Sequence, residues 1–327
     1  MLGSFLEAAL NINSRLMKPC LTHSLNLLSL SFGLLFFFSL FLPSATLARS
    51  LIPETVTFNS ADDKVKLIGF MYLPDAKLWP DARPAVVMLH GRSGIYSSSA
   101  KHHDATTLAA RTVLWGKFWA DRGYIGLYID TFGPRGYFKG FEAGTNNGSR
   151  PREINEITVR PFDAYMGLKY LRSRTDVQKN NVFLQGWSNG GSAALSTMAR
   201  DSVGFEKPTP ETGFRAAIAV YPACTPVSKH YGSRYQTYAP LMLLIGTEDE
   251  EVSVAKCEKL VGDSPSSALN NADGGDLIFV RYIGAQHSYD TPSSKRQAVA
   301  ANVAATEDTK LRAEAFFKKH LVVPFEK

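Results

Sequence analysis

Apolar and polar residues follow one another along the chain in blocks that predict strands and helices in turn. Ala85–Leu89 is apolar throughout, which is the pattern of a strand buried on both of its faces. Other short apolar segments have the same length and similar flanking turns. The predicted strands are Val65–Tyr72, Ala85–Leu89, Tyr124–Asp130, Asn181–Gln185, Ala216–Tyr221, Leu241–Gly246 and Leu277–Tyr282.

Between these strands, apolar residues recur with the spacing of an α-helix. Pro161 stands near the start of one such segment, a position where its missing N–H costs little. The predicted helices are Arg111–Arg122, Pro161–Arg174, Gly190–Arg200 and a long final helix over Ala298–His320. Repeated alternation of strand and helix predicts an α/β fold with a mainly parallel sheet and helices on both faces.

Two long polar connections interrupt this alternation, Gly91–Leu108 and Gly133–Glu156. Long loops in a compact domain are frequently functional, so we expect them to cover a site. In parallel sheets that site lies beyond the carboxyl ends of the strands. Residues 49–327 show no linker or repeat, which predicts one domain.

The N-terminal segment has the pattern of a secretory signal peptide. Arg15 and Lys18 precede the uncharged run Leu25–Leu42, and small residues follow up to Ala48. We therefore predict a signal peptide over residues 1–48, with Met17 as an alternative start. The run is also long enough for an uncleaved membrane anchor, which stays the alternative. With cleavage, the mature protein is exported and free of the membrane.

Composition narrows the classes of partner. The chain carries 36 basic and 30 acidic residues, a net charge of +6, with no dense basic run. Nucleic-acid binding needs a concentrated basic face or a known motif, so we expect neither DNA nor RNA as a partner. After signal cleavage two cysteines remain, Cys224 and Cys257. In an exported protein such a pair indicates either a disulfide or two buried free thiols.

The segment Gly186–Gly190 fits the pattern G-x-S-x-G around Ser188. It follows an apolar strand and opens a helix of small residues, which is the context of a nucleophile elbow. The serine of such an elbow sits on a tight, strained turn, where side chains two residues to either side would strike the backbone. Ser188 is therefore the predicted nucleophile.

A serine hydroxyl needs a base, and the base should follow the last strand. His287 stands there, and the acidic turn after Leu241–Gly246 supplies Asp249 as the orienting acid. The order Ser188, Asp249, His287 is that of α/β-hydrolases. Other acids in the same turn remain alternatives for the orienting role: Glu248, Glu250 and Glu251.

An oxyanion hole requires two donors directed at the tetrahedral intermediate. We assign the backbone N–H of Asn189, directly after the nucleophile. The second assignment is the N–H of Arg92, in the loop after Ala85–Leu89, with Ser93 as the alternative.

Substrate contacts are expected from Arg135, Trp187 and Tyr96. Arginines near the site mouth, among them Arg92, Arg135 and Arg160, would suit a substrate carboxylate, although ordinary surface arginines explain them equally well. The cluster His102-His103-Asp104 lacks further ligand spacing, so we expect no metal and no cofactor.

Together these segments resemble the dienelactone hydrolase family, in particular its exported serine-nucleophile branch. The matching stretches are HGRSGIYSS, WGKFWADRGY, IDTFGPRGY, VRPFDAYMGLKYLR, GWSNGG, YPAC, LLIGTEDEEV and GAQHSYD. The resemblance implies an α/β-hydrolase fold with about eight strands and a triad of Ser188, His287 and Asp249. It also implies small esters or lactones as substrates. Members that open dienelactone use a cysteine nucleophile, and Ser188 departs from that pattern, so a general carboxylester hydrolase is expected.

In a sheet of this kind the two mature-chain cysteines follow neighbouring strands on the same side. Cys224 comes just after Ala216–Tyr221, and Cys257 lies in the helix after Asp249. We therefore predict a Cys224–Cys257 disulfide.

The expected activity is hydrolysis of a small-molecule ester or lactone through an acyl-enzyme. An acyltransferase on the same triad is one alternative, and a peptidase is another. A non-catalytic exported binding protein is a third, although loss of a triad residue would be expected there, and this chain has all three.

Overall fold

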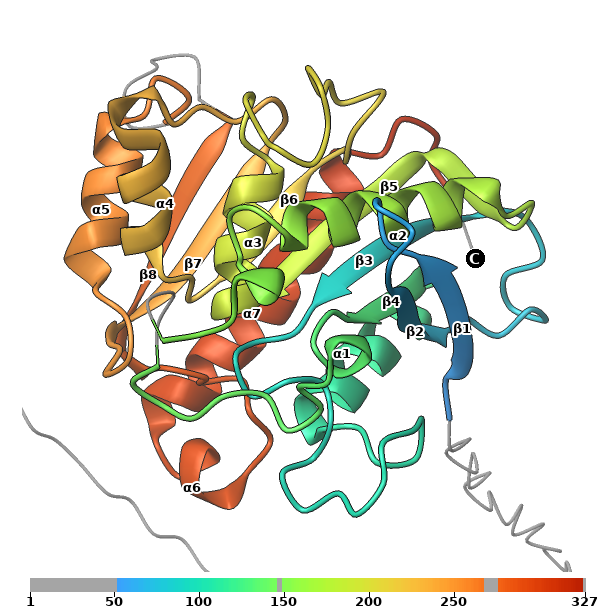
Figure 1. The fold of residues 1–327 in the computed structure, drawn as a ribbon, viewed down its shortest axis with the longest axis horizontal. Coiled ribbons are helices and arrows are strands. Elements are labelled where there is room, and N and C mark those ends of the chain that lie inside the picture. The colour runs from blue at the N-terminus through green and yellow to red at the C-terminus, as the bar shows by residue number, and fades with distance from the viewer. Residues whose placement is uncertain (1–51, 146–148, 268–275, 326–327) are drawn as a thin grey trace, which may run out of the picture. The chain divides into compact units, whose positions relative to one another are not determined.

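The computed structural model describes residues 52–145, 149–267 and 276–325 (Figure 1). Within these ranges the chain forms one eight-stranded sheet in the order β1-β2-β4-β3-β5-β6-β7-β8. The predicted α/β architecture is confirmed. The predicted signal peptide lies outside the described residues, so it and the division at residue 48 stay predictions.

Most of the sheet is parallel. From β4 through β3 to β8 every neighbouring pair is parallel, whereas β2 runs antiparallel to both β1 and β4. The carboxyl ends of the parallel strands therefore meet at one edge of the sheet. The strands are β1 Glu54–Asn59, β2 Lys66–Tyr72, β3 Arg83–Leu89, β4 Ile125–Asp130, β5 Val177–Trp187, β6 Ala217–Val220, β7 Leu241–Glu248 and β8 Leu277–Gln286.

Several strands differ from the predicted ranges: β5 and β7 are longer than predicted, and β1 and β8 differ in ways that affect the sheet edge and the site. The edge strand β1 was not predicted, because none of its six residues is buried and it pairs with β2 alone. Strand β8 continues to Gln286, beyond the predicted end at Tyr282, so His287 follows the strand directly.

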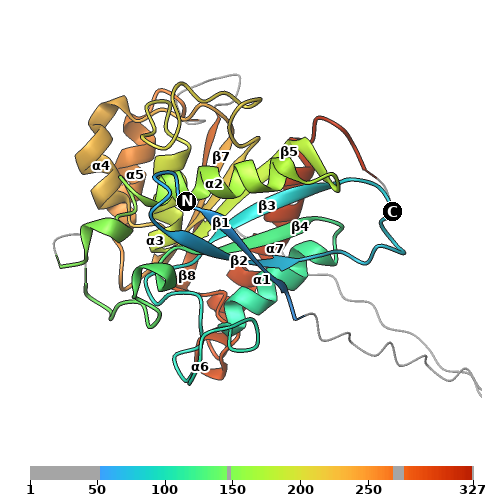
Figure 2. The same ribbon diagram turned by 45° about the vertical axis from the view of Figure 1, so that its right-hand side comes forward.

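Helices cover both faces of the sheet, as predicted (Figures 1 and 2). Ile129 packs against Gly167 of α2, whereas Gly126, on the other face of the same strand, lies beneath Gly116 of α1. Helix α7 shares the face of α1, since the rings of Trp119 and Phe317 stack at 5.0 Å. The helices are α1 Ala110–Ala120, α2 Arg160–Ser173, α3 Asn189–Thr197, α4 Cys224–Tyr231, α5 Val254–Asp263, α6 Ser294–Gln297 and α7 Ala300–Lys319.

The predicted final helix is divided. Val299 has extended backbone angles and separates the short helix α6 from α7. The hydroxyl of Ser293 accepts a hydrogen bond from the backbone of Arg296 and caps α6. Helix α4 was not predicted, because it is short and contains Pro226.

The hydrophobic core is apolar and extends up to the carboxyl ends of the strands. All seven residues of β3 are buried, as its sequence predicted. The rings of Trp187 and Tyr128 stack at 5.6 Å beneath the carboxyl edge of the sheet. No helix within the described ranges has the length and apolarity required to cross a lipid bilayer.

A disulfide joins Cys224, the first residue of α4, to Cys257 in α5. Both cysteines are buried, and the predicted pairing is confirmed. The bridge fixes these two helices to each other beside the carboxyl ends of β6 and β7.

Candidate active site

Ser188 occupies the turn between β5 and α3. Its backbone has φ 52° and ψ −118°, a conformation that is strained for a residue with a side chain. Glycines make this turn sterically possible. A Cβ at Gly186 would lie 2.0 Å from the carbonyl oxygen of Gly190, and a Cβ at Gly190 would lie 2.1 Å from that of Leu89. The strained turn directs the Ser188 hydroxyl above the sheet edge.

A hydrogen-bond chain connects three of the predicted residues. His287 Nε2 lies 3.0 Å from Ser188 Oγ, and His287 Nδ1 lies 2.8 Å from Asp249 Oδ2. The side chains of His287 and Asp249 are almost completely buried, and Ser188 is only 8% exposed. The structure thus brings together residues that are 38 and 99 positions apart in the chain.

Backbone donors fix Asp249 in this arrangement. Its Oδ1 accepts hydrogen bonds from the amides of Glu251 and Val252, both at 2.9 Å. The remaining oxygen therefore faces His287. Of the alternative acids, Glu248 is exposed at the end of β7.

Glu250 and Glu251 contact His287 in other ways. Glu250 accepts a hydrogen bond from the backbone N–H of His287 at 2.9 Å and pairs with Arg296 at 2.5 Å. Glu251 Oε2 lies 3.7 Å from His287 Nε2, on the side of the ring that faces Ser188. Neither carboxylate is hydrogen-bonded to Nδ1, so the geometry favours Asp249 as the orienting acid.

The predicted oxyanion donors lie beside the serine. Asn189 is the first residue of α3, where the backbone N–H groups of a helix start are free to bind an anion. Gly91 packs so closely that a Cβ there would lie 3.4 Å from Ser188 Cβ, which places the following amide of Arg92 near the serine. Arg92 also lines the cavity that contains Ser188, whereas Ser93 does not.

Arg160, which the sequence placed near the site mouth, is fully buried beneath the elbow. It donates to Asn189 Oδ1 at 2.5 Å and to the carbonyl of His90 at 2.8 Å. Burial lowers the pKa of Arg160 to about 10, against the opposing influence of Glu156 and Asp163. This guanidinium joins the loop after β3 to the first turn of α3.

The side chain of Arg92 is held by Glu251. Two hydrogen bonds of 2.9 and 2.8 Å join the guanidinium to this carboxylate, and a third reaches the carbonyl of Phe141 at 3.0 Å. Burial opposes ionisation of Glu251, but Arg92 and His287 outweigh it and lower the pKa of this carboxyl. The pair forms one rim of the site next to the imidazole.

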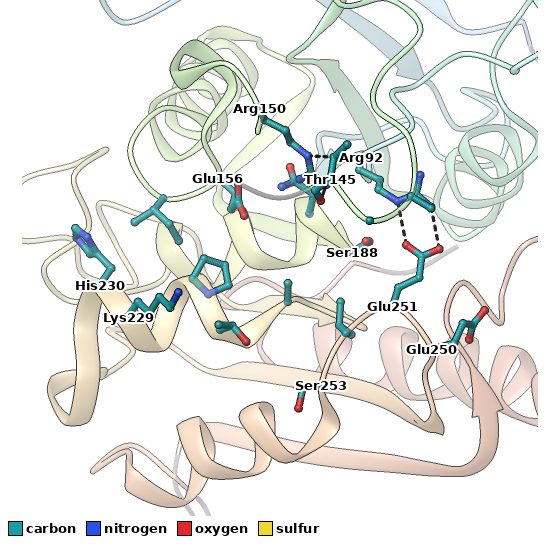
Figure 3. A pocket seen from close by; sticks show the side chains of 18 residues that line it. Arg92, Thr145, Arg150, Glu156, Ser188, Lys229, His230, Glu250, Glu251 and Ser253 are labelled. Carbon is teal, nitrogen blue, oxygen red and sulfur yellow. Dashed lines mark hydrogen bonds and ion pairs between the residues drawn. The ribbon is translucent and has the colours of Figure 1, made fainter. Parts of the chain in front are cut away.

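Ser188 opens into a cavity of about 1070 Å³ (Figure 3). The predicted covering loop Gly133–Glu156 supplies part of its wall through Thr145, Arg150 and Glu156. The opposite wall comes from α4 and from the turn before α5, and the disulfide joins α4 to α5 itself.

The covering loop is fastened to the loop after β3 by direct backbone contact. Phe141 N–H donates to the carbonyl of Arg92 at 2.8 Å. Gly140 has φ +64°, and a Cβ there would lie 2.2 Å from the carbonyl carbon of Ser93. Only glycine permits this approach.

The expected substrate contacts lie elsewhere. Arg135 forms a buried ion pair with Asp163, with two hydrogen bonds of 2.8 and 2.9 Å, so its guanidinium is occupied. Trp187 is fully buried, and Tyr96 packs edge-on against Phe70. None of Arg135, Trp187 and Tyr96 lines the cavity that contains Ser188.

Asp290 is a site residue that the sequence reasoning missed. Its buried carboxylate accepts hydrogen bonds from Trp115 at 2.7 Å, Trp187 at 2.8 Å and Tyr221 at 2.5 Å, and it pairs with Arg111 at 3.2 Å. The ring of Tyr221 in turn meets the imidazole of His287 edge-on at 4.8 Å. The only available signal was its place three residues after the predicted base, within the segment GAQHSYD.

Within the described parts of the chain, no group of three or more His, Cys, Asp or Glu side chains is arranged to hold a metal ion. His102 and Asp104, from the cluster considered in the sequence, form an exposed pair at 3.4 Å.

Comparison with known proteins assigns a family to this arrangement. The profile of the "Dienelactone hydrolase family" matches residues 69–321. The quorum-quenching protein AidA of Acinetobacter baumannii is 28% identical over 176 residues. That alignment covers 53% of this chain and 49% of AidA, so the match spans about half the length of this curated relative.

Solved structures share the fold at low sequence identity. A dienelactone hydrolase-type protein from Klebsiella pneumoniae has a TM-score of 0.57 and 15% identity, covering 81% of this chain and 98% of that one. Esterase 2 of Thermogutta terrifontis, solved phosphorylated by paraoxon, has a TM-score of 0.53 and 16% identity, covering 83% and 96%. These likenesses bear out the α/β-hydrolase architecture.

Proposed function

The chain belongs to the dienelactone hydrolase family, and from that premise we propose that it is a serine hydrolase that cleaves small carboxylic esters or lactones. One observation supports the proposal above all others. A continuous hydrogen-bond chain runs from Asp249 through His287 to Ser188, and Ser188 opens into a cavity.

In the proposed reaction His287 accepts the proton of Ser188 as the oxygen attacks the ester carbonyl. Asp249 keeps the proton of Nδ1 in place and stabilises the imidazolium that forms. His287 then gives its proton to the departing alkoxide. Water, deprotonated by the same imidazole, hydrolyses the acyl-enzyme and restores the hydroxyl of Ser188.

The proposed oxyanion hole consists of the backbone N–H groups of Asn189 and Arg92. Loss of one such donor typically costs about 3–4 kcal/mol of transition-state stabilisation. The buried contact of Arg160 with Asn189 and His90 supports the two segments that carry these amides. Preorganised donors of this kind need no reorganisation while charge develops.

The identity of the nucleophile affects which substrates are expected. Ser188 stands where dienelactone-opening members carry cysteine, so we propose general carboxylic esters and lactones rather than dienelactone. We also propose that the protein is exported. The buried Cys224–Cys257 disulfide supports this, because such bonds persist in oxidising compartments.

Labelling with a fluorophosphonate probe tests the proposal. We expect the wild-type protein to be labelled and Ser188→Ala to remain unlabelled. Ser173→Ala, at an exposed serine of α2 outside the cavity, is the matched control and should label like the wild type. A folded wild type that takes no label would refute the hydrolase proposal and favour a binding protein.

A further inference from the structure

Glu156 is a buried carboxylate in the wall of the cavity that contains Ser188. It lies between the short turn Arg152–Ile154 and α2, and its side chain is 3% exposed. Its Oε2 accepts no hydrogen bond from the residues that the structure describes. Buried polar groups are almost always hydrogen-bonded, and an unpaired buried charge is costly, so this carboxylate requires an explanation.

The two arginines whose charge Glu156 influences donate mainly to other groups, and Nε of Arg160 has no partner among the described residues. Arg150 donates to the carbonyl and hydroxyl of Thr145, at 2.6 and 3.1 Å. Arg160 donates to Asn189 and to His90. Glu156 nevertheless raises the pKa of both guanidinium groups, whereas burial lowers it. The two arginines therefore balance the charge of Glu156 without satisfying its oxygens.

The carboxylate faces the same hollow as the nucleophile. Figure 3 shows Glu156 among the residues that line this cavity, to which Ser188 also contributes. The surrounding wall includes the apolar residues Ile157, Pro226 and Val252. A molecule that fills the cavity can therefore supply a donor to Glu156.

We propose that Glu156 is a specificity residue that accepts a hydrogen bond from a neutral donor, a hydroxyl or an amide N–H, carried by the ester or lactone away from its scissile carbonyl. This inference rests on the proposed hydrolase function and narrows its substrate class. A second carboxylate would be repelled by Glu156. An ammonium group would be repelled by Arg150 and Lys229, which line the cavity, and by the charge of Arg160 buried beneath the elbow.

Matched substrates test the proposal in the full-length protein. The rates of hydrolysis of ethyl hexanoate and of the same ester with a hydroxyl on its third or sixth carbon are compared by pH-stat. We expect at least one hydroxylated ester to have a kcat/KM about tenfold above that of the plain ester, since hydrogen bonds to charged groups contribute roughly this much.

Variants assign the preference to Glu156. In Glu156→Leu, which has no acceptor, we expect the ratio of the two kcat/KM values to fall to about one. In Glu156→Gln, whose carbonyl still accepts but carries no charge, we expect the ratio to fall by about threefold. Glu153→Gln, at an exposed acid three residues earlier that pairs with Tyr137, should keep the wild-type ratio. If Glu156→Leu does not fold, Glu156→Gln decides alone.

The possible failures are distinguishable. If wild type hydrolyses neither ester and takes no fluorophosphonate label, the hydrolase function itself fails. If wild type hydrolyses all the esters at equal kcat/KM, or if the preference is unchanged in Glu156→Gln, the role of Glu156 is overturned while the hydrolase function stands.

Discussion

Two buried carboxylates near Ser188 differ completely in their surroundings. Asp290, behind His287, meets three neutral donors and a guanidinium. Glu156, across the cavity, has an Oε2 that accepts no hydrogen bond from any residue that the structure describes. A carboxylate whose oxygens are all hydrogen-bonded within the protein stabilises the fold, whereas one with an unpaired oxygen can still accept a hydrogen bond from a ligand.

The same difference extends to the walls that carry them. The wall that includes Asp249, His287 and Asp290 is connected by hydrogen bonds from backbone and side chains. The wall that includes Glu156 belongs to a loop whose charged groups are only partly paired, whereas the disulfide joins α4 to α5 on the side of the turn that follows Asp249. We therefore expect substitutions on the first wall to alter catalysis and stability, and those on the second to alter substrate preference.

The largest effect should come from Asp249→Asn. An amide can present an N–H to His287, which would favour the wrong tautomer, and in comparable triads this lowers kcat by about 10⁴-fold. Steady-state kinetics with p-nitrophenyl acetate would measure it, with Glu248→Gln as the neighbouring exposed control. A loss smaller than tenfold would indicate that another acid orients the imidazole.

Asp290→Ala should produce the next largest effect, a destabilisation of about 4–5 kcal/mol, because it leaves Arg111 and three donors unpaired in the interior. Urea denaturation would measure the free energy of unfolding. Asp308→Asn, which removes an exposed ion pair with Arg312, should change it by less than about 0.5 kcal/mol. Equal stability of the two variants would remove the structural role assigned to Asp290.

Removal of the disulfide tests the wall formed by α4 and the turn before α5. The double variant Cys224→Ala, Cys257→Ala should lose about 3–4 kcal/mol of stability, the value for a closed loop of this length. Thermal and urea unfolding with and without a reductant would show it, and the double variant should not respond to the reductant. A wild type that is equally insensitive would contradict a stabilising bridge.

The smallest effect should be that of Glu156→Gln on stability. Because Oε2 accepts no hydrogen bond from the described residues and the attraction to Arg150 and Arg160 acts at longer range, the free energy of unfolding should fall by no more than about 1 kcal/mol. The same urea titration would measure it. A loss comparable to that of Asp290→Ala would show that both carboxylates stabilise the fold, and would contradict the difference in role proposed for them.

The sequence pattern was sufficient to predict features that depend on residues close together in the chain. The apolar run of β3, the glycines around Ser188 and the place of His287 after a strand were all readable in this way. Strand β1 was missed because its apolar stripe is short: only Val56 and Phe58 alternate with polar residues and pack against the core.

The partners of buried charges were not readable. Arg135 was expected at the substrate, yet it pairs with Asp163, 28 residues away. Asp290 finds partners more than a hundred residues distant. The partner of a buried charge depends on how distant segments pack together. The periodicity of apolar residues along the chain does not reveal that partner.

Because the backbones of Gly140 and Ser93 are in contact, we expect the two loops to tolerate sequence changes only when both change together. A relative's version of residues 133–156 could replace this one only together with a compatible Arg92–Ser93 segment, because the two backbones interlock without an intervening side chain. Shuffling experiments that exchange both segments should therefore yield folded chimeras more often than those that exchange either one.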